Sequence, residues 1–292
     1  MNEQTSMTFL DTLKIFPQYF LPHHFLSAIM HKLTRCEQKA FKNLMIQQIA
    51  KRYNVDMTDA VEPDLTAYPS FNHFFTRALK PEARPICSEP NSIACPVDGA
   101  ISQIGDIKAD QIFQAKGHDY SIKTLLGNDD SYKKFINGKF ATIYLSPKDY
   151  HRIHTPIDGS LEKMIHIPGR LFSVNEVTAT HVPGLFARNE RVLSLFQTSA
   201  GPMAVILVGA IFVSSMETVW EGTITPPAGF QIRTWDYEKR NSKVRLDKGS
   251  ELGRFNMGST VILLFPEDSM TWNETLFATN TVKMGQDIGS VV

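Results

Sequence analysis

The sequence predicts an α+β protein in which N-terminal amphipathic helices precede a sheet-rich body with room for two related β-units. Three observations support this fold class. Apolar residues recur at helical spacing before residue 55, an acidic connector with prolines follows over residues 55–69, and short β-type runs dominate beyond residue 90. We therefore expect a helical region over residues 1–55 and a body over residues 56–292.

The N-terminal region is expected to form two short amphipathic helices, separated by Pro17 and Pro22, and a third helix over roughly residues 37–53. The first two apolar faces are rich in Phe and Leu: Phe9, Leu10, Leu13, Phe16, Phe25, Leu26, Ile29, Met30 and Leu33. Such faces are typical of helices that lie in a bilayer interface, and docking on the protein's own core fits the pattern equally well.

The charge of the chain is unevenly distributed. The formal net charge is zero, which excludes the overall basic bias of a nucleic-acid-binding protein. Residues 1–55, however, carry seven Lys and Arg against three acidic residues, so the body is net acidic. The cationic front favours contact with anionic lipid.

Cysteine content and N-terminal pattern define the expected compartment. Three cysteines without CxxC spacing predict neither a disulfide framework nor a zinc ribbon, and fit reduced thiols in the cytosol. The front segment is interrupted by Asp11, Lys14 and two prolines, so it matches neither a signal peptide nor a spanning helix.

The body is expected to be built from short strands separated by Gly and Pro. The β-type runs cover residues 100–107, 140–145, 192–198, 203–213, 217–224 and 260–265. Two similar Pro-x-Asp-Gly turns, at residues 96–99 and 156–159, each lead into a run, which is ordinary hairpin chemistry and leaves a weak internal repeat open.

Two polar motifs in the body could carry chemistry. Asp98 lies in the first Pro-x-Asp-Gly turn, where an Asp commonly bonds its own backbone. His151 and His154 are three residues apart, so they share a face on a helix but point to opposite sides of a strand. Metal ligation, a satisfied core position and an acid/base pair all remain open for them.

Two further blocks stand out. Residues 172–175 and 185–191 place polar side chains in apolar sequence, which fits a pocket wall or a solvated loop equally well. Residues 253–260 end in Gly258, Ser259 and Thr260 and lead into the apolar run 261–265. By itself, a Gly-Ser-Thr turn before a strand is common.

Together and in this order, these blocks closely resemble the bacterial phosphatidylserine decarboxylases, pyruvoyl enzymes whose proenzymes cut themselves at a Gly-Ser bond. The resemblance covers nearly the whole chain, including residues 71–77, 96–105, 115–117, 145–156, 171–175, 185–191, 217–227 and 253–265. The last block is the most specific. Met257 stands where many bacterial members have Leu, a replacement of similar volume that is compatible with cleavage.

The resemblance implies a role for each motif residue. Asp98, His154 and Ser259 match the charge relay for self-cleavage, with Asp98 as carboxylate, His154 as general base and Ser259 as nucleophile. His151 matches a residue of the decarboxylation step. Cleavage between Gly258 and Ser259 would give a large chain, 1–258, and a small chain, 259–292, and would turn Ser259 into the covalent pyruvoyl cofactor.

The same resemblance implies the reaction. Phosphatidylserine would form a Schiff base with the pyruvoyl group and be decarboxylated to phosphatidylethanolamine in phospholipid biosynthesis, without pyridoxal phosphate and without metal. The two chains would form a heterodimer, with further dimerisation open. A lipid substrate favours the membrane interpretation of residues 9–33 and places the protein at the cell membrane, as a peripheral protein on its cytoplasmic side. For the substrate phosphate, Arg188, Arg191 and Lys116 are cations in matching blocks.

Three alternatives remain. A Ser-His-Asp hydrolase could use Asp98, His154 and Ser259, although no Gly-x-Ser-x-Gly elbow surrounds Ser259. A metal-dependent peptidase could use both histidines with Asp98. A membrane-bound scaffold would need just the helices and the body, but it gives no reason for the motifs to coincide.

Overall fold

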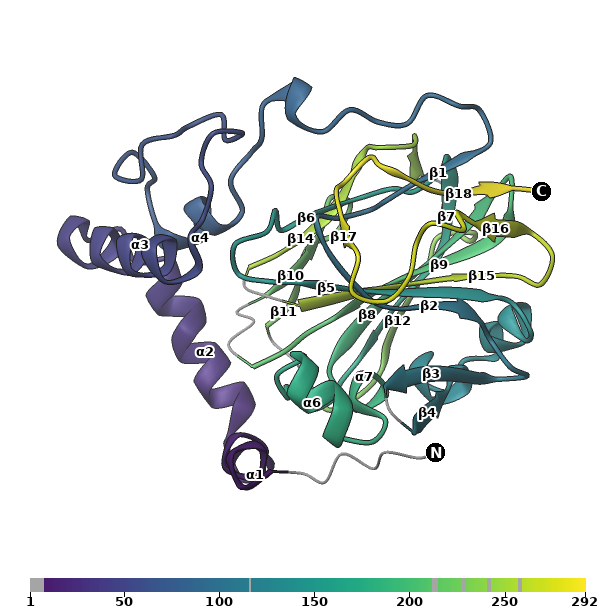
Figure 1. Cartoon of the computed structure of the whole chain (residues 1–292), viewed down its shortest axis with the longest axis horizontal. Helices are drawn as coiled ribbons and strands as arrows, with labels where there is room; N and C mark the ends of the chain where they lie inside the picture. The colour runs from purple at the N-terminus through teal and green to yellow at the C-terminus, as the bar shows by residue number, and fades with distance from the viewer. Residues whose placement is uncertain (1–7, 116, 212–214, 227–228, 241–242, 257–258) are drawn as a thin grey trace.

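The computed structural model describes residues 8–115, 117–211, 215–226, 229–240, 243–256 and 259–292. Helices α1 to α3 lie along one side of a β-rich body (Figure 1), as the α+β prediction requires. The helical elements are α1 (Phe9–Ile15), η1 (Phe16–Tyr19), α2 (His23–Thr34), α3 (Lys39–Tyr53), α4 (Phe71–Phe75), η2 (Pro81–Ala83), α5 (Ile122–Leu125), η3 (Asp130–Phe135), α6 (Glu176–His181) and α7 (Leu185–Arg188).

Local sequence signals explain the helix boundaries. Thr8 and Asp11 form a capping box at the start of α1, and Pro17 is the second residue of the 3₁₀ helix that follows it. Helix α3 ends at Asn54, which adopts the left-handed conformation. The three predicted N-terminal helices are confirmed, with the third beginning two residues later than expected.

The body is dominated by a large antiparallel sheet. Its order is β12-β7-β8-β9-β15-β5-β2-β17, with β13 also paired to β7. These strands are β12 (Arg233–Asp236), β7 (Gly159–Ile167), β8 (Arg191–Thr198), β9 (Gly201–Val208), β15 (Ser259–Phe265), β5 (Lys139–Leu145), β2 (Gly99–Asp106), β17 (Thr281–Val282) and β13 (Arg245–Leu246). The two similar turns lead into β2 and β7 of this one sheet.

Three smaller sheets complete the described part of the body. They are ordered β1-β18-β16, β11-β10-β14-β6 and β3-β4. Their strands are β1 (Ser92–Ala94), β18 (Asp287–Val291), β16 (Met270–Trp272), β11 (Gly222–Thr225), β10 (Met216–Thr218), β14 (Glu251–Phe255), β6 (Arg152–His154), β3 (Gln111–Ala115) and β4 (His118–Ser121). The run expected over residues 217–224 is two strands, because the chain turns back at Gly222 with positive φ.

Strand β15 forms the centre of the core. All seven of its side chains are buried, and it pairs with β9 on one side and β5 on the other. A run that is apolar on both faces is what a doubly covered strand requires. The first residue of this central strand is Ser259, so the predicted nucleophile is anchored on the most buried element of the fold.

The N-terminal helices contact the body in different ways: α3 docks through Ile46, which is buried in a cluster with Phe71 and Phe74, whereas α2 turns polar residues inward. In α2 the buried side chains are His23, Ser27 and Thr34. The large apolar side chains point to solvent: Leu13, Phe16, Tyr19, Phe20, Phe25, Ile29 and Leu33 are exposed. The side chains of Phe9 and Leu10 lie outside the described part. Most of the apolar surface of α1, η1 and α2 is therefore exposed, although Ile15 is buried and Leu26 and Met30 are half-buried.

Within the described residues, no helix combines the length and the apolar character needed to cross a bilayer.

Candidate active site

Ser259 has a buried hydroxyl with no protein partner. Its side chain is 0% exposed, and Oγ has no hydrogen-bond partner among the described residues. Ser259 stands opposite Leu145 of β5. Five other buried Ser and Thr hydroxyls of the described residues, including that of the adjacent Thr260, also lack a partner, so the free Oγ makes Ser259 available for chemistry without by itself assigning it a role. Gly258 and Met257 lie outside the described residues.

His151 presents a second unpartnered atom. Nδ1 lies 2.8 Å from the carbonyl oxygen of Asp149, which makes it the donor and leaves the lone pair on Nε2, and that atom is buried without a partner. The Phe75 ring packs at 4.1 Å between centroids. Burial, with a contribution from the Arg77 charge, lowers the pKa of His151 to about 3. At neutral pH this imidazole is an uncharged base.

His151 is tied to the chain that leads to Ser259. Its carbonyl oxygen accepts a hydrogen bond of 3.1 Å from the backbone N–H of Phe255, at the end of β14. The turn after β5, which contains Asp149, thus connects the strand opposite Ser259 to the histidine.

His154 has both ring nitrogens occupied. Nδ1 donates to the carbonyl oxygen of Gly249 at 2.8 Å, and the hydroxyl of Tyr150 lies 3.1 Å from Nε2. Burial lowers its pKa. Within the described residues, no hydrogen bond joins His154 to Asp98 or Ser259.

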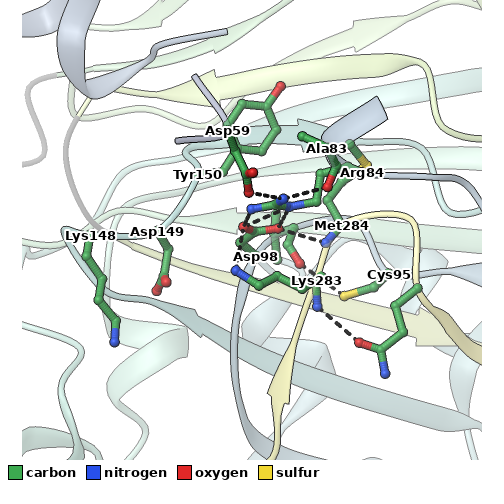
Figure 2. A network of polar contacts seen from close by, with 12 residues as sticks. Asp59, Ala83, Arg84, Cys95, Asp98, Lys148, Asp149, Tyr150, Lys283 and Met284 are labelled. Atoms are coloured by element: carbon green, nitrogen blue, oxygen red, sulfur yellow. Dashed lines mark hydrogen bonds and ion pairs between the residues drawn. The ribbon is translucent and has the colours of Figure 1, made fainter. Parts of the chain in front are cut away.

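Asp98 is buried and bound by three other residues (Figure 2). Arg84 donates from Nε at 2.9 and 3.1 Å and from Nη2 at 2.5 Å, the backbone N–H of Met284 donates at 2.9 Å, and Nζ of Lys283 lies at 3.4 Å. Burial raises the pKa of Asp98, but the hydrogen bonds from Arg84 and Met284 outweigh it, so the pKa lies below its usual value. The Asp98 charge also acts to raise the pKa of His151 and of His154, against the larger effect of burial.

Arg84 is a site residue that sequence reasoning missed. Its Nη1 also binds Asp59 at 2.8 Å, so it joins the connector to the Asp98 turn. Arg84 lies in an ordinary Ala-Arg-Pro segment, and its role depends on tertiary contacts. The structure therefore does not connect Asp98, His154 and Ser259 by hydrogen bonds, and their assigned roles stay predictions.

The predicted pocket wall is partly supported. A cavity of about 460 Å³ is lined by Val174 and Glu176, and also by Tyr144, which pairs with Thr260. Residues 189–191 are buried, which excludes a solvated loop there. They brace the fold and do not line this cavity: the three guanidinium nitrogens of Arg191 all donate to backbone carbonyl oxygens.

The remaining chemical predictions concern thiols and metal. Cys36, Cys87 and Cys95 are all free thiols, as expected. In the described part of the chain, no cluster of three or more His, Cys, Asp or Glu side chains has the arrangement of a metal site.

A buried serine with an unpartnered hydroxyl, and a neutral histidine in the segment that follows the strand opposite it, are two groups of this region with free capacity for proton transfer. The sequence model of the phosphatidylserine decarboxylase family matches residues 71–290, and a second, described as PSD, matches residues 13–54. A phosphatidylserine decarboxylase proenzyme of Shewanella frigidimarina is 53% identical over 95% of this chain and 97% of its own length. A proenzyme of the same name from Pseudomonas putida is 52% identical over 96% of this chain and 98% of its own length. The chain belongs to the phosphatidylserine decarboxylase family.

Proposed function

We propose that the protein converts phosphatidylserine to phosphatidylethanolamine and carbon dioxide, with a pyruvoyl group formed from Ser259. The observation that carries the proposal is the buried, unpartnered Oγ of Ser259 at the start of β15, in a chain that matches the family over almost its full length. Bound in the site, a pyruvoyl group supplies a ketone that accepts the electrons released when carbon dioxide leaves.

The residues fit the formation of that group. Ser259 Oγ would attack the carbonyl carbon of Gly258, so that the C–O bond forms as the C–N bond breaks. Loss of the Ser259 Cα proton would then expel the Gly258 carboxylate and leave dehydroalanine at residue 259. Tautomerisation to the imine and hydrolysis by water would release ammonia and leave the ketone. A base must remove the Oγ proton. We propose His154 for this step and His151 for the later decarboxylation, as the family resemblance implies.

The geometry adds one requirement to this assignment. His154 Nε2 is hydrogen-bonded to Tyr150, and Asp98 is bound by Arg84. A charge relay of Asp98, His154 and Ser259 would therefore require these hydrogen bonds to break first. His151, with Nε2 already free, supports the proposal that it acts on a bound substrate. Separate His154→Ala and His151→Ala variants distinguish the steps, since the first should stay uncut and the second should be cut but inactive.

We also propose peripheral association with the cytoplasmic side of the cell membrane. The exposed Phe and Leu side chains of η1 and α2, beside a cationic front segment, support it. The acyl chains of the substrate could then stay in the bilayer while the head group enters the site.

Intact mass and denaturing electrophoresis of the purified protein test the function. We expect chains of residues 1–258 and 259–292, the second with a blocked N-terminus, together with carbon dioxide release from phosphatidylserine. Ser259→Ala should give one uncut, inactive chain. A single wild-type chain that carries an ordinary Ser259 would favour the hydrolase alternative.

A further inference from the structure

Two buried arginines of this protein are held in opposite ways. Arg191 is 3% exposed, and each of its three guanidinium nitrogens donates to a backbone carbonyl oxygen at 2.6–2.8 Å. Arg77 is 5% exposed, and its guanidinium lies over the Phe74 ring at 5.7 Å from the centroid. Of its nitrogens, Nη2 alone has a hydrogen-bond partner in the described part of the chain, the carbonyl oxygen of Lys148 at 3.0 Å. Its Nε and Nη1 are buried without a hydrogen-bond partner in the described part of the chain. A buried cation with free N–H groups is costly unless an anion meets it.

The surrounding acidic groups do not fill this role. Asp98 and Asp149 attract the Arg77 charge, but Asp98 is bound by Arg84 and Met284, and Asp149 accepts from the backbone N–H of Ser146 at 2.7 Å. Burial outweighs the attraction of nearby acidic groups and lowers the pKa of Arg77. The guanidinium therefore has capacity for a further anion.

Arg77 lies in the same site as His151. It binds the carbonyl oxygen of Lys148, and the next carbonyl, of Asp149, accepts the Nδ1 hydrogen bond of His151. The Arg77 charge contributes to the lowered pKa of His151. The ring of Phe75, two residues before Arg77, packs on the His151 ring at 4.1 Å between centroids. Ser259 pairs with Leu145, so Arg77, His151 and Ser259 all contact residues 145–149.

The other cations that the sequence singled out are engaged elsewhere or lie outside the description. Arg191 is saturated by carbonyl oxygens. Arg188, unlike Arg77, is exposed, and its guanidinium lies over the rings of Tyr19 and Phe172, at 5.6 and 5.3 Å from their centroids. Lys116 lies outside the described residues.

We propose that Arg77 binds the phosphodiester of the substrate head group through Nε and Nη1, an assignment that rests on the decarboxylase function proposed above. The substrate carboxylate is the less suitable partner. An ion pair to a charge that disappears as carbon dioxide forms would stabilise the ground state more than the transition state. The phosphodiester keeps its charge throughout, so its ion pair adds affinity without raising the barrier.

Inhibition of the mature enzyme by two soluble head-group fragments tests the proposal. Glycerophosphoethanolamine carries the phosphodiester and amine without a carboxylate, and L-serine carries the carboxylate and amine without phosphate. In Arg77→Gln we expect self-cleavage to proceed and the inhibition constant of glycerophosphoethanolamine to rise about tenfold or more, with that of serine within about twofold of wild type. Arg77→Lys should lie between.

Thermal melting separates this role from a structural one. Arg77→Gln removes an unpaired buried charge and should melt at or above the wild-type temperature. Arg191→Lys, the matched control, loses carbonyl hydrogen bonds and should melt lower with an unchanged inhibition constant.

Several outcomes would overturn the proposal: no inhibition of the wild type by glycerophosphoethanolamine, an unchanged constant in Arg77→Gln, or loss of serine inhibition instead. If Arg77→Gln does not fold, Arg77→Lys carries the same comparison. Carbon dioxide release by the wild type reports on the proposed function independently of Arg77.

Discussion

At the scale of single residues, the buried carboxylate of Asp98 depends on Arg84. The Arg84 side chain also binds Asp59, so one guanidinium serves two carboxylates of different exposure: the side chain of Asp98 is 3% exposed and that of Asp59 is 48% exposed. Removing the buried charge leaves a partly unpaired cation, whereas removing the exposed one leaves the main pair intact.

We therefore expect Asp98→Asn to lower the free energy of unfolding by ~3 kcal/mol, near the lower end for a broken buried pair. Asp59→Asn should cost less than about 1 kcal/mol, as for exposed pairs. Both are measured by urea unfolding in the Ser259→Ala background, where the chain stays continuous. Equal effects of the two variants would show that the Arg84 pair contributes no burial-dependent stability.

His151 predicts how stability depends on pH. Its pKa is about 3 in the folded protein against about 6.5 in an unfolded chain, so the unfolded state binds more protons between these values. The contribution of His151 is complete above pH 6.5 and is lost as the pH falls towards 3. At pH 5 the free energy of unfolding is therefore ~2 kcal/mol lower than above pH 6.5.

The check is the acid dependence of unfolding in His151→Gln, again without self-cleavage. This variant should lose ~2 kcal/mol less than its parent between pH 7 and 5. Parallel curves for parent and His151→Gln would mean that the buried imidazole does not titrate as described.

Sequence reasoning found the motif residues but not their partners. Asp98, His151, His154 and Ser259 stand in recognisable local patterns, and the structure places all four in buried or half-buried positions. The contacts that define their state are long-range: Asp98 with Met284, for example, or His154 with Gly249. Such pairs are far apart in the chain and follow from the folded topology, which no local pattern encodes.

At the scale of elements, α2 is oriented with its apolar side chains outward. Because His23, Ser27 and Thr34 face the body, the large apolar groups remain available to a bilayer. Periodicity predicted the amphipathic helix but left its direction open, since membrane and core docking have the same pattern. The orientation is set by polar contacts such as the hydrogen bond that His23 Nδ1 accepts from the backbone N–H of Leu171, 148 residues away in the chain.

We expect the triple variant Phe16→Ser, Phe20→Ser, Phe25→Ser to lose vesicle binding about a hundredfold or more, because each ring contributes ~2 kcal/mol on transfer to lipid. Co-sedimentation with vesicles containing anionic phospholipid measures this, and self-cleavage should persist. Phe230→Ser, at a fully exposed position on the body, is the matched control. Undiminished binding of the triple variant would place the membrane contact elsewhere.

The strand elements were predicted unevenly. The run over residues 260–265 is confirmed as β15, since a long apolar stretch before a proline has few other solutions. Strands β16, β17 and β18 were not predicted, because they are short and lack a clear alternation of apolar and polar residues. Their pairing makes them strands: β17 pairs with the distant β2, and β18 lies between β16 and the distant β1.

At the scale of the whole molecule, residues 259–292 contribute strands to two sheets. Strand β15 is central in the large sheet, β17 extends its edge at β2, and β18 lies between β1 and β16. Lys283 and Met284 also bind Asp98. Cleavage before Ser259 would leave these contacts in place.

The two chains of the cleaved protein should therefore migrate as one species of about 33 kDa in native size-exclusion chromatography, close to the 32.9 kDa of the intact chain or a multiple of it. They should separate in denaturant. Early release of the small chain under native conditions would contradict the arrangement of β15.

The central position of β15 also implies that folding precedes cleavage. Before the cut, β15 and the strands that pair with it belong to one continuous chain, so folding is a first-order process. After the cut, an unfolded large chain would have to bind the separate 34-residue small chain from solution, because the small chain supplies β15 at the middle of the main sheet. Renaturation would become second-order and would compete with aggregation. The uncleaved proenzyme can therefore unfold and refold as one chain, whereas the cleaved protein would not readily refold once its two chains have separated.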